Sequence, residues 1–570
     1  MRILLLTHSF NSLTQRLTVE LRQAGHEVSI EFDIADSVTE EAVALFRPDL
    51  IVAPYLRRAI PASVWTRYVC LVVHPGIVGD RGPSALDWAI EEGEPYWGVT
   101  VLQAEAEMDA GPVWACAEFE LCEAKKSSVY RNEVTQAAAA AVLLAVERYA
   151  GGRFAPTRPE LVPGARGRLR PAMRQEDRRI DWTRHGTSEV LRRIHAADGA
   201  PGVADSLFGE SCHLFDAWPE SSLHGRPGEL IARRETAVLR GTADGAVWIG
   251  HVRRAGGIKL PTALAFAETA DALPERPLDG WWRAADATWQ DIWYEEAGAV
   301  GLLHFEFYNG AMSAAQCARL QSALRWVRQR EVAVLVLMGG NDFWSNGIHL
   351  NVIEAASLAG GSAADESWRN INAMNDLALE LIANESQLTV AALCGNAGAG
   401  GCFLARAADL VWARDTALLN PHYKNMGNLY GSEYWTYLLP RRVGAAAAAA
   451  IMRDRQPLTA RRAQEIGLID DCISGEPKVF RDAVAARAAA LATDGTAMRS
   501  MAEKRVARAA DEAVKPLAVY REEELTHMRR NFYGFDPSYH VARHHFVHKS
   551  PASWTPRHLA RHREPGWRTP

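Results

Sequence analysis

The amino-acid sequence predicts an α/β protein built from several domains. The first 110 residues alternate short apolar runs with helical patterns, which is typical of a parallel sheet with helices on its faces. Short β-like runs dominate the next region, and the α/β pattern returns from about residue 296. The chain has 570 residues, which at roughly 150 residues a domain suggests three or four domains.

Four apolar runs in the first region have the length of buried strands: 3–6, 28–32, 50–53 and 70–73. Ligands of parallel sheets bind beyond the carboxyl ends of the strands. The loop after the first strand and the loop that begins at His74 are therefore the expected site. The first loop reads THSFNSLTQ and lacks G-x-G-x-x-G, which removes the main support for a dinucleotide site.

Two breaks divide the rest of the chain. Segment 151–171 is rich in Gly, Pro and Arg, and segment 273–282 is rich in Pro. Between them we expect a helix and then a small OB-like β-barrel, with a hairpin turn at Asp244-Gly245. The expected helix is 188–197, and the expected strands are 229–233, 237–240 and 247–252. Further strands are expected at 332–338 and 388–393. The expected domains are 1–165, 166–275 and 285–550.

Charge and composition restrict the function classes. The formal net charge of −6 provides no overall basic field for nucleic acid. The eight cysteines include no C-x-x-C pair, which favours reduced thiols in a cytoplasmic protein over zinc or redox motifs. The apolar stretches 135–146 and 443–452 are shorter than the ~20 residues of a membrane span. We expect a cytoplasmic protein that binds small-molecule substrates, without nucleic acid or membrane.

The first chemical motif is a histidine at a strand end. His74 follows the strand 71–73, and Asp109 follows the strand 98–103. A histidine can transfer a proton near neutral pH, and a carboxylate can fix its tautomer. His74 alone is equally compatible with a structural hydrogen bond, and Asp109 alone is most typical of a turn residue.

Together these segments resemble the 10-formyltetrahydrofolate transferase and hydrolase family. The matching motifs are His74-Pro75, Arg81-Gly82, Gly98-Val99-Thr100 and Asp109-Ala110-Gly111, in order and spacing. The resemblance covers about residues 1–255. It implies a formyltransferase fold with His74 and Asp109 as catalytic residues and 10-formyltetrahydrofolate as formyl donor. The candidate folate- or coenzyme A-binding residues are Ser12, Gln15, Arg81, Gly82 and Arg131.

One position departs from that family. The family's catalytic Asn, which polarises the formyl oxygen, falls at Val72. Loss of such a donor typically costs on the order of 3 kcal/mol of transition-state stabilisation. Either another donor replaces it, or the acceptor is a better nucleophile than water or an amine, such as a thiol.

The last region contains FWSNGIHL (343–350), CGNAGAGGCFLA (394–405) and LTARRAQEIGLID (458–470), which resemble the crotonase (enoyl-CoA hydratase/isomerase) superfamily. The resemblance implies an oxyanion hole from the amides of Ile348 and Gly400. The hydratase carboxylates fall at Phe403 and His422, so the chain is not expected to hydrate. Tyr423 and Glu433 just downstream are the alternative catalytic candidates, although ordinary polar core residues would look the same.

The fusion of these two regions resembles the HypX/HoxX family of hydrogenase maturation factors. That resemblance implies a bifunctional enzyme that makes carbon monoxide for the [NiFe]-hydrogenase active site. Its first activity transfers the formyl group to coenzyme A, and its second, a lyase, decarbonylates formyl-CoA. Glu433 would remove the formyl hydrogen and Tyr423 would orient it or relay the proton. A transient hydrogenase maturation partner is compatible with this role.

The sequence is also compatible with two other functions. One is a formyltransferase that acts on an amine or tRNA, with the crotonase-like region as a binding module. Another is a non-catalytic scaffold that binds folate and coenzyme A. No metal is expected: His540, His544 and His548 share a helix face, but the nearby sequence supplies no suitable carboxylate. The candidate partners of the coenzyme A phosphates are Arg131, Arg441, Arg442, Arg453 and Arg455.

Overall fold

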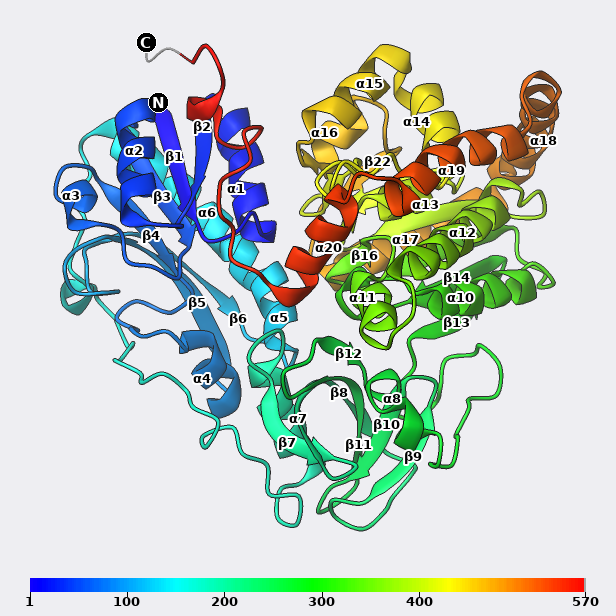
Figure 1. Ribbon diagram of the computed structural model, residues 1–570, viewed down its shortest axis with the longest axis horizontal. Coiled ribbons are helices and arrows are strands. Elements are labelled where there is room, and N and C mark those ends of the chain that lie inside the picture. Colours follow the sequence, from blue (N-terminus) through cyan, green and yellow to red (C-terminus); the bar gives the residue numbers. More distant parts are fainter. Residues whose placement is uncertain (568–570) are drawn as a thin grey trace.

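The computed structural model describes residues 1–567 and contains three domains that pack against one another (Figure 1). The first domain has a six-stranded sheet in the order β2-β1-β3-β4-β5-β6. Its strands are β1 (Arg2–Thr7), β2 (Glu27–Phe32), β3 (Leu50–Tyr55), β4 (Cys70–His74), β5 (Tyr96–Gln103) and β6 (Val113–Glu120). The first four strands pair in parallel as predicted, whereas β5 and β6 pair antiparallel.

Helices cover both faces of this sheet because its strands are apolar on both sides. The main helices are α1 (Ser12–Gln23), α2 (Asp36–Phe46), α4 (Ala85–Glu92), α5 (Lys126–Val129) and α6 (Thr135–Gly151). Leu71 and Val73 of β4 belong to the core shared with α1 and α6. Val72, between them, packs on the opposite side with the α2 core. A single π-helical turn, Tyr130–Val134, joins α5 to α6.

The middle domain is an antiparallel barrel, preceded by α7 (Thr187–Ala197). Its strands are β7 (Val203–Leu207), β8 (Glu210–Glu220), β9 (Leu230–Arg234), β10 (Ala237–Gly241), β11 (Ala246–Arg254) and β12 (Lys259–Pro261). Figure 1 shows these strands curving around a common centre. The predicted turn at Asp244-Gly245 connects β10 and β11, which pair antiparallel.

The C-terminal domain has two sheets. The larger has the order β13-β14-β15-β17-β19-β22 and the smaller the order β16-β18-β20-β21. The larger comprises β13 (Ile292–Ala297), β14 (Val300–Phe305), β15 (Val334–Gly339), β17 (Leu388–Leu393), β19 (Leu410–Arg414) and β22 (Asp471–Ile473). The smaller comprises β16 (Phe343–Ser345), β18 (Asn396–Gly398), β20 (Leu418–Asn420) and β21 (Leu458–Thr459).

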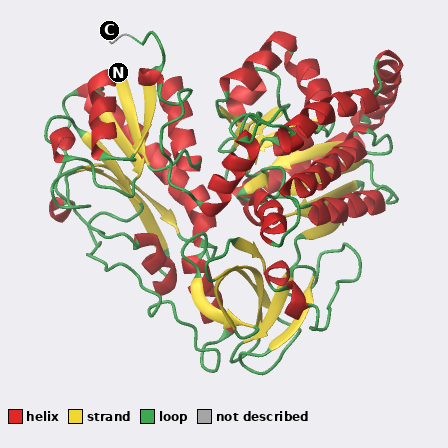
Figure 2. Cartoon of the chain, in the orientation of Figure 1, coloured by secondary structure: helices red, strands yellow, loops and turns green. Residues whose placement is uncertain are grey.

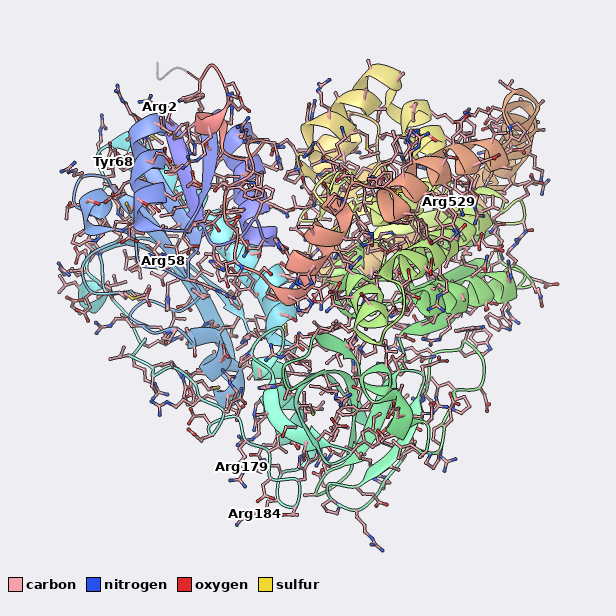
Figure 3. All side chains as sticks on the ribbon, in the orientation of Figure 1. Arg2, Arg58, Tyr68, Arg179, Arg184 and Arg529 are labelled. Carbon is pink, nitrogen blue, oxygen red and sulfur yellow. The ribbon has the colours of Figure 1, made fainter. Side chains whose placement is uncertain are left out.

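Helices surround these sheets (Figure 2). They include α10 (Ala314–Val327), α11 (Leu350–Leu358), α12 (Ala363–Ile382), α13 (Gly400–Arg406), α14 (Trp435–Val443), α15 (Ala445–Asp454), α17 (Pro477–Thr493), α18 (Thr496–Val514), α19 (Leu517–Tyr533) and α20 (Ser538–His548). Within residues 1–567, no helix is both long and apolar enough to cross a membrane. Figure 3 labels cationic side chains on all three domains, among them Arg58, Arg179 and Arg529.

The chain finally returns to the domain where it began. We call residues 549–567 the C-terminal strap; Figure 1 shows it running from α20 back to β2. The Ile30 amide donates to the Leu559 carbonyl at 3.1 Å. The buried carboxylate of Glu31 accepts from Arg563 at 2.6 Å and pairs with His562 at 2.9 Å. The strap therefore ties the C-terminal domain to the first sheet.

Candidate active site

The first candidate site lies at the carboxyl end of β4, where the sequence predicts it. His74 is only 4% exposed and stands between two carboxylates. Its Nε2 is 3.0 Å from Asp80 Oδ1, and its Nδ1 is 3.6 Å from Asp109 Oδ1. The Asp109 carboxylate also accepts from the Gly82 amide at 3.3 Å. The structure thus brings together His74, Asp109 and Gly82.

Sequence reasoning missed Asp80. Its second oxygen accepts from the Nε of Arg170 at 3.0 Å, and both side chains are buried. Gly76 leaves room for this pair: a Cβ there would lie 2.4 Å from His74 Nε2. The only sequence signal was an acidic residue six positions after the histidine, which is too common in turns to be informative.

The other predicted folate- or coenzyme A-binding residues are dispersed. Arg81 is 2.5 Å from Glu107 at the surface. Ser12 is the first residue of α1 and half-buried. Gln15, one turn further, accepts from the Asn420 side chain at 3.0 Å. Gln15 therefore faces the C-terminal domain, and Asn420 ends β20 there.

The second candidate site is assembled by the smaller sheet of the C-terminal domain. Strands β16, β18 and β20 lie side by side, which places the chain segments after them at one edge. The Gly347 carbonyl accepts from the Met312 amide at 2.9 Å. Because a trans peptide directs its N–H opposite to its C=O, the Ile348 amide points away from Met312.

The Gly400 amide lies close to that loop. It begins α13, where the first N–H groups have no partner within the helix. A Cβ added to Gly347 would lie 3.4 Å from the Gly400 nitrogen, so the two loops are in contact. This arrangement suits the binding of a carbonyl oxygen by two amides.

Glu433 lies against the N-terminus of α13. A Cβ on Gly400 would be 2.4 Å from Glu433 Oε1, so only glycine permits this approach. The Tyr423 hydroxyl donates to Glu433 Oε2 at 2.5 Å. Glu433 is 1% and Tyr423 5% exposed. The structure therefore brings Tyr423, Glu433 and Gly400 together in one buried cluster.

Burial dominates the electrostatics of this cluster. It raises the pKa of Glu433 to about 8, the hydrogen bond from Tyr423 opposes this rise, and the nearby Glu524 adds to it. Burial and the adjacent Glu433 also raise the pKa of Tyr423 well above its usual value. Near neutral pH the carboxyl group can therefore exchange a proton, whereas the tyrosine stays protonated.

Two buried residues that the sequence did not reveal hold the segment that carries Glu433. Asn375 Oδ1 accepts from the Glu433 amide at 2.7 Å. Glu524 accepts from the Tyr434 amide at 3.0 Å and from the Thr436 amide at 2.8 Å. Glu433 and Tyr434 both have positive φ, so these contacts stabilise an uncommon backbone conformation. Asn375 and Glu524 lie in distant helices, α12 and α19.

Phe403 and His422 occupy the positions at which hydratases of the family have catalytic carboxylates. The ring of Phe403 is fully buried and stacks on Tyr423, with ring centroids 5.5 Å apart. His422 is buried too, and neither of its ring nitrogens has a hydrogen-bond partner among residues 1–567. Burial lowers the pKa of His422 to about 4, so the imidazole is neutral near pH 7.

The first and C-terminal domains meet around Arg131, which lies in the π-helical turn. Its guanidinium donates to Asp342 at 2.9 Å and to Asn309 at 2.8 Å. A polar cavity at this junction is lined by residues of both domains. They include Arg16, Arg131, Asn132, Asn341, Asp342 and Arg414.

Further cations gather near Arg131. Burial lowers the pKa of Lys259 to about 8; the charges of Arg131 and Lys549 add to this effect and Asp198 opposes it. Lys549 also has a lowered pKa, through burial and Arg131. The other arginine candidates have partners elsewhere: Arg441 pairs with Asp511, Arg442 with Asp470, Arg453 with Asp454, and Arg455 with Asn428.

Comparison with family models agrees with this division of the chain. Residues 2–146 match the formyl transferase model and residues 172–269 match the formyl transferase C-terminal domain. Residues 299–557 match the enoyl-CoA hydratase/isomerase model. These matches confirm the predicted fold class, including both families that the motifs resemble.

Two similar proteins span essentially the whole chain. The hydrogenase maturation factor HoxX of Bradyrhizobium diazoefficiens is 55% identical over 99% of this chain and 97% of its own. The crystal structure of HypX from Aquifex aeolicus in complex with tetrahydrofolic acid is 46% identical, covers 100% of both chains and has a TM-score of 0.95. The methionyl-tRNA formyltransferase of Ralstonia nicotianae is 25% identical over 42% of this chain and 72% of its own.

Proposed function

The chain belongs to the HypX/HoxX family of hydrogenase maturation factors, and on that basis we propose that it synthesises carbon monoxide from a formyl group. The donor is 10-formyltetrahydrofolate and the intermediate is formyl-CoA. The tetrahydrofolic acid in the related HypX structure supports a folate donor. The pairing of a formyltransferase region with an enoyl-CoA hydratase-like domain supports a thioester intermediate.

The first reaction uses the site around His74. The coenzyme A thiol loses its proton to His74, and the sulfur forms a bond to the formyl carbon. The bond from that carbon to the folate nitrogen breaks, and His74 returns the proton to this nitrogen. Asp80 holds the imidazole, and Asp109 stabilises it when it is charged. The products are formyl-CoA and tetrahydrofolate.

The junction between the domains is our candidate site for the coenzyme A phosphates. Arg131, Lys259 and Lys549 supply positive charge there, and their mutual repulsion favours a bound anion. Gln15 lies on the same interface. A molecule held at this junction is in reach of both domains, which suits an intermediate that must leave one site and enter the other.

The second reaction uses the site around Glu433. The thioester oxygen accepts from the Ile348 and Gly400 amides, and the carboxylate of Glu433 takes the formyl proton. The electron pair of the C–H bond stays on carbon, and that of the C–S bond leaves with sulfur. The products are carbon monoxide and a thiolate, which Glu433 protonates to restore the base. Tyr423 orients the carboxylate.

One observation carries this assignment. A carboxyl group with a pKa of about 8 lies beside the Gly400 amide and aromatic rings, and it is almost inaccessible to water. Water must be excluded because formyl-CoA would otherwise be hydrolysed. Phe403, at the position of a hydratase carboxylate, contributes to that exclusion.

The Glu433→Gln variant tests the order of the two reactions. Given 10-formyltetrahydrofolate labelled with ¹³C in the formyl group and coenzyme A, the variant should accumulate labelled formyl-CoA, detected by mass spectrometry. The wild-type protein should release labelled carbon monoxide instead. If the variant forms no formyl-CoA while it still consumes the donor, the formyl group goes to a different acceptor.

The same experiment separates the other functions that the sequence leaves open. Replacing coenzyme A by tRNA or a simple amine tests a formyltransferase of the tRNA type, and its phosphate contacts would weaken with salt. Tight binding of folate and coenzyme A without any turnover would indicate a scaffold. Formyl transfer to tRNA and not to coenzyme A would contradict our proposal.

A further inference from the structure

A cluster of two histidines and one glutamate lies at the contact between α11 and α20. His544 and His548 occur one turn apart on α20, and Glu354 comes from α11. Glu354 Oε1 lies 3.0 Å from His544 Nδ1 and 3.1 Å from His548 Nε2. All three ligand atoms lie within 4.8 Å of one another. Among residues 1–567 it is the one such group of three or more.

The fold supplies the carboxylate that the local sequence lacks. Within residues 1–567, no acidic side chain close to α20 in the sequence completes a ligand set with its histidines. Glu354 is nearly 200 residues away and reaches them through the packing of α11 on α20. His540, the third histidine on this face, is directed elsewhere. Its Nδ1 contacts Arg543, and its Nε2 pairs with the Phe532 carbonyl at 2.8 Å.

We propose that Glu354, His544 and His548 bind a divalent transition-metal ion of the zinc class. Imidazole nitrogen and carboxylate oxygen are common zinc ligands, and in a tetrahedral site the ligand atoms are roughly 3.3 Å apart. The two separations from Glu354 Oε1 are close to that value, and the two imidazole nitrogens lie within 4.8 Å of each other. His544 and His548 are partly exposed, which leaves the fourth position to water.

Arg543 limits how the carboxylate can act. Its Nε donates to Glu354 Oε2 at 2.8 Å, and both side chains are buried. Glu354 can therefore offer the ion one oxygen, while Arg543 fixes the orientation of the other. A partner of this kind that holds a ligand in place is usual around protein metal sites. The ion would link the C-terminal helix α20 to α11, which begins two residues after Ile348.

Metal analysis of the tag-free, full-length protein tests the site. The protein is stripped with a chelator, dialysed against Zn²⁺ alone and analysed for bound metal by mass spectrometry. We expect one equivalent per chain and a melting temperature that rises with Zn²⁺ concentration. Co²⁺ in place of Zn²⁺ should give the visible absorption of a tetrahedral site. His544→Ala and His548→Ala should each weaken binding by at least about 100-fold.

The matched control is His545→Ala, which removes the exposed histidine next to His544 and should bind metal like the wild type. Glu354→Gln removes the charge and retains most of the shape; circular dichroism checks that each variant folds. Exposed thiols such as Cys116 can also bind Zn²⁺. Binding that persists in both histidine variants, or the absence of stoichiometric binding to the wild type, would overturn the proposal and leave a hydrogen-bonded triad.

Discussion

The Tyr423 hydroxyl donates a 2.5 Å hydrogen bond to the carboxylate of Glu433, and both side chains are nearly closed to solvent. Burial disfavours the charged carboxylate, whereas the hydrogen bond favours it. The balance leaves a group that can accept a proton near neutral pH. This pair is the basis of our assignment of the second reaction.

Replacing the base without changing its shape should block decarbonylation. For Glu433→Gln we expect the rate of carbon monoxide formation from added formyl-CoA to fall by at least two orders of magnitude, on the scale of general-base catalysis. Coenzyme A binding by calorimetry should stay near the wild-type value. Tyr423→Phe should cause a smaller loss if the hydroxyl only orients Glu433, and a comparable loss if it relays the proton. Carbon monoxide formation by Glu433→Gln at nearly the wild-type rate would refute the base and direct attention to His422.

The pH dependence of the second reaction should report the raised pKa of Glu433. A base acts in its deprotonated form, so kcat/KM for formyl-CoA should rise with pH and level off above about 8. Between pH 6 and pH 8 the expected increase is roughly 50-fold, from the ionised fraction of a group with that pKa. Tyr423→Phe removes the bond that favours the carboxylate, so its inflection should move to higher pH. A rate that falls over this range would instead identify Glu433 as an acid.

The two sites should be separable by mutation. His74→Ala removes the proton relay of the first reaction, so transfer from 10-formyltetrahydrofolate should be abolished, whereas added formyl-CoA should still yield carbon monoxide. Asp80→Asn keeps the shape but removes the charge beside His74 Nε2, and should slow the first reaction alone. Glu433→Gln is the reciprocal control, because it should retain the first reaction. Equal loss of both activities in His74→Ala would assign this histidine a structural role.

Glu524 should act as a positioning residue for Glu433. In Glu524→Gln an amide nitrogen would face backbone N–H groups, and a buried unsatisfied donor costs about 1–3 kcal/mol. We expect at least a tenfold lower rate of decarbonylation. The pH inflection should move to lower pH, because the Glu524 charge helps to raise the pKa of Glu433. The control is Glu523→Gln on the same helix, an exposed residue paired with Lys515. An unchanged inflection would show that Glu524 only stabilises the fold.

Much of the fold was predictable because its signals are local. Apolar runs fixed the positions of β1, β3, β4 and β17, and the Asp244-Gly245 pair marked a hairpin turn. Apolar periodicity does not distinguish the antiparallel strands β5 and β6 from the parallel strands before them, because strand direction depends on which strands pair. The C-terminal strap was missed for a similar reason: its partner, Glu31, is more than 500 residues away.

The residues of the candidate sites also differ in whether the local sequence identifies them. His74 and Asp109 could be proposed because each belongs to a motif with family spacing. Tyr423 and Glu433 could be proposed because they are polar residues just downstream of the replaced hydratase carboxylates. The structure places the four residues in two clusters. Asp80, Asn375 and Glu524 support those residues from elsewhere in the fold and carry no motif. Lys259 and Lys549 likewise join Arg131 only after three domains have packed together.

Carbon monoxide synthesis is tested most directly by an assay of the intact wild-type protein. The protein is incubated with 10-formyltetrahydrofolate and coenzyme A, and deoxyhaemoglobin traps the product. We expect carbon monoxide only when both compounds are present, because the formyl group must pass through a thioester before it reaches Glu433. Carbon monoxide released at full rate without coenzyme A, or none released with both compounds present, would contradict the account.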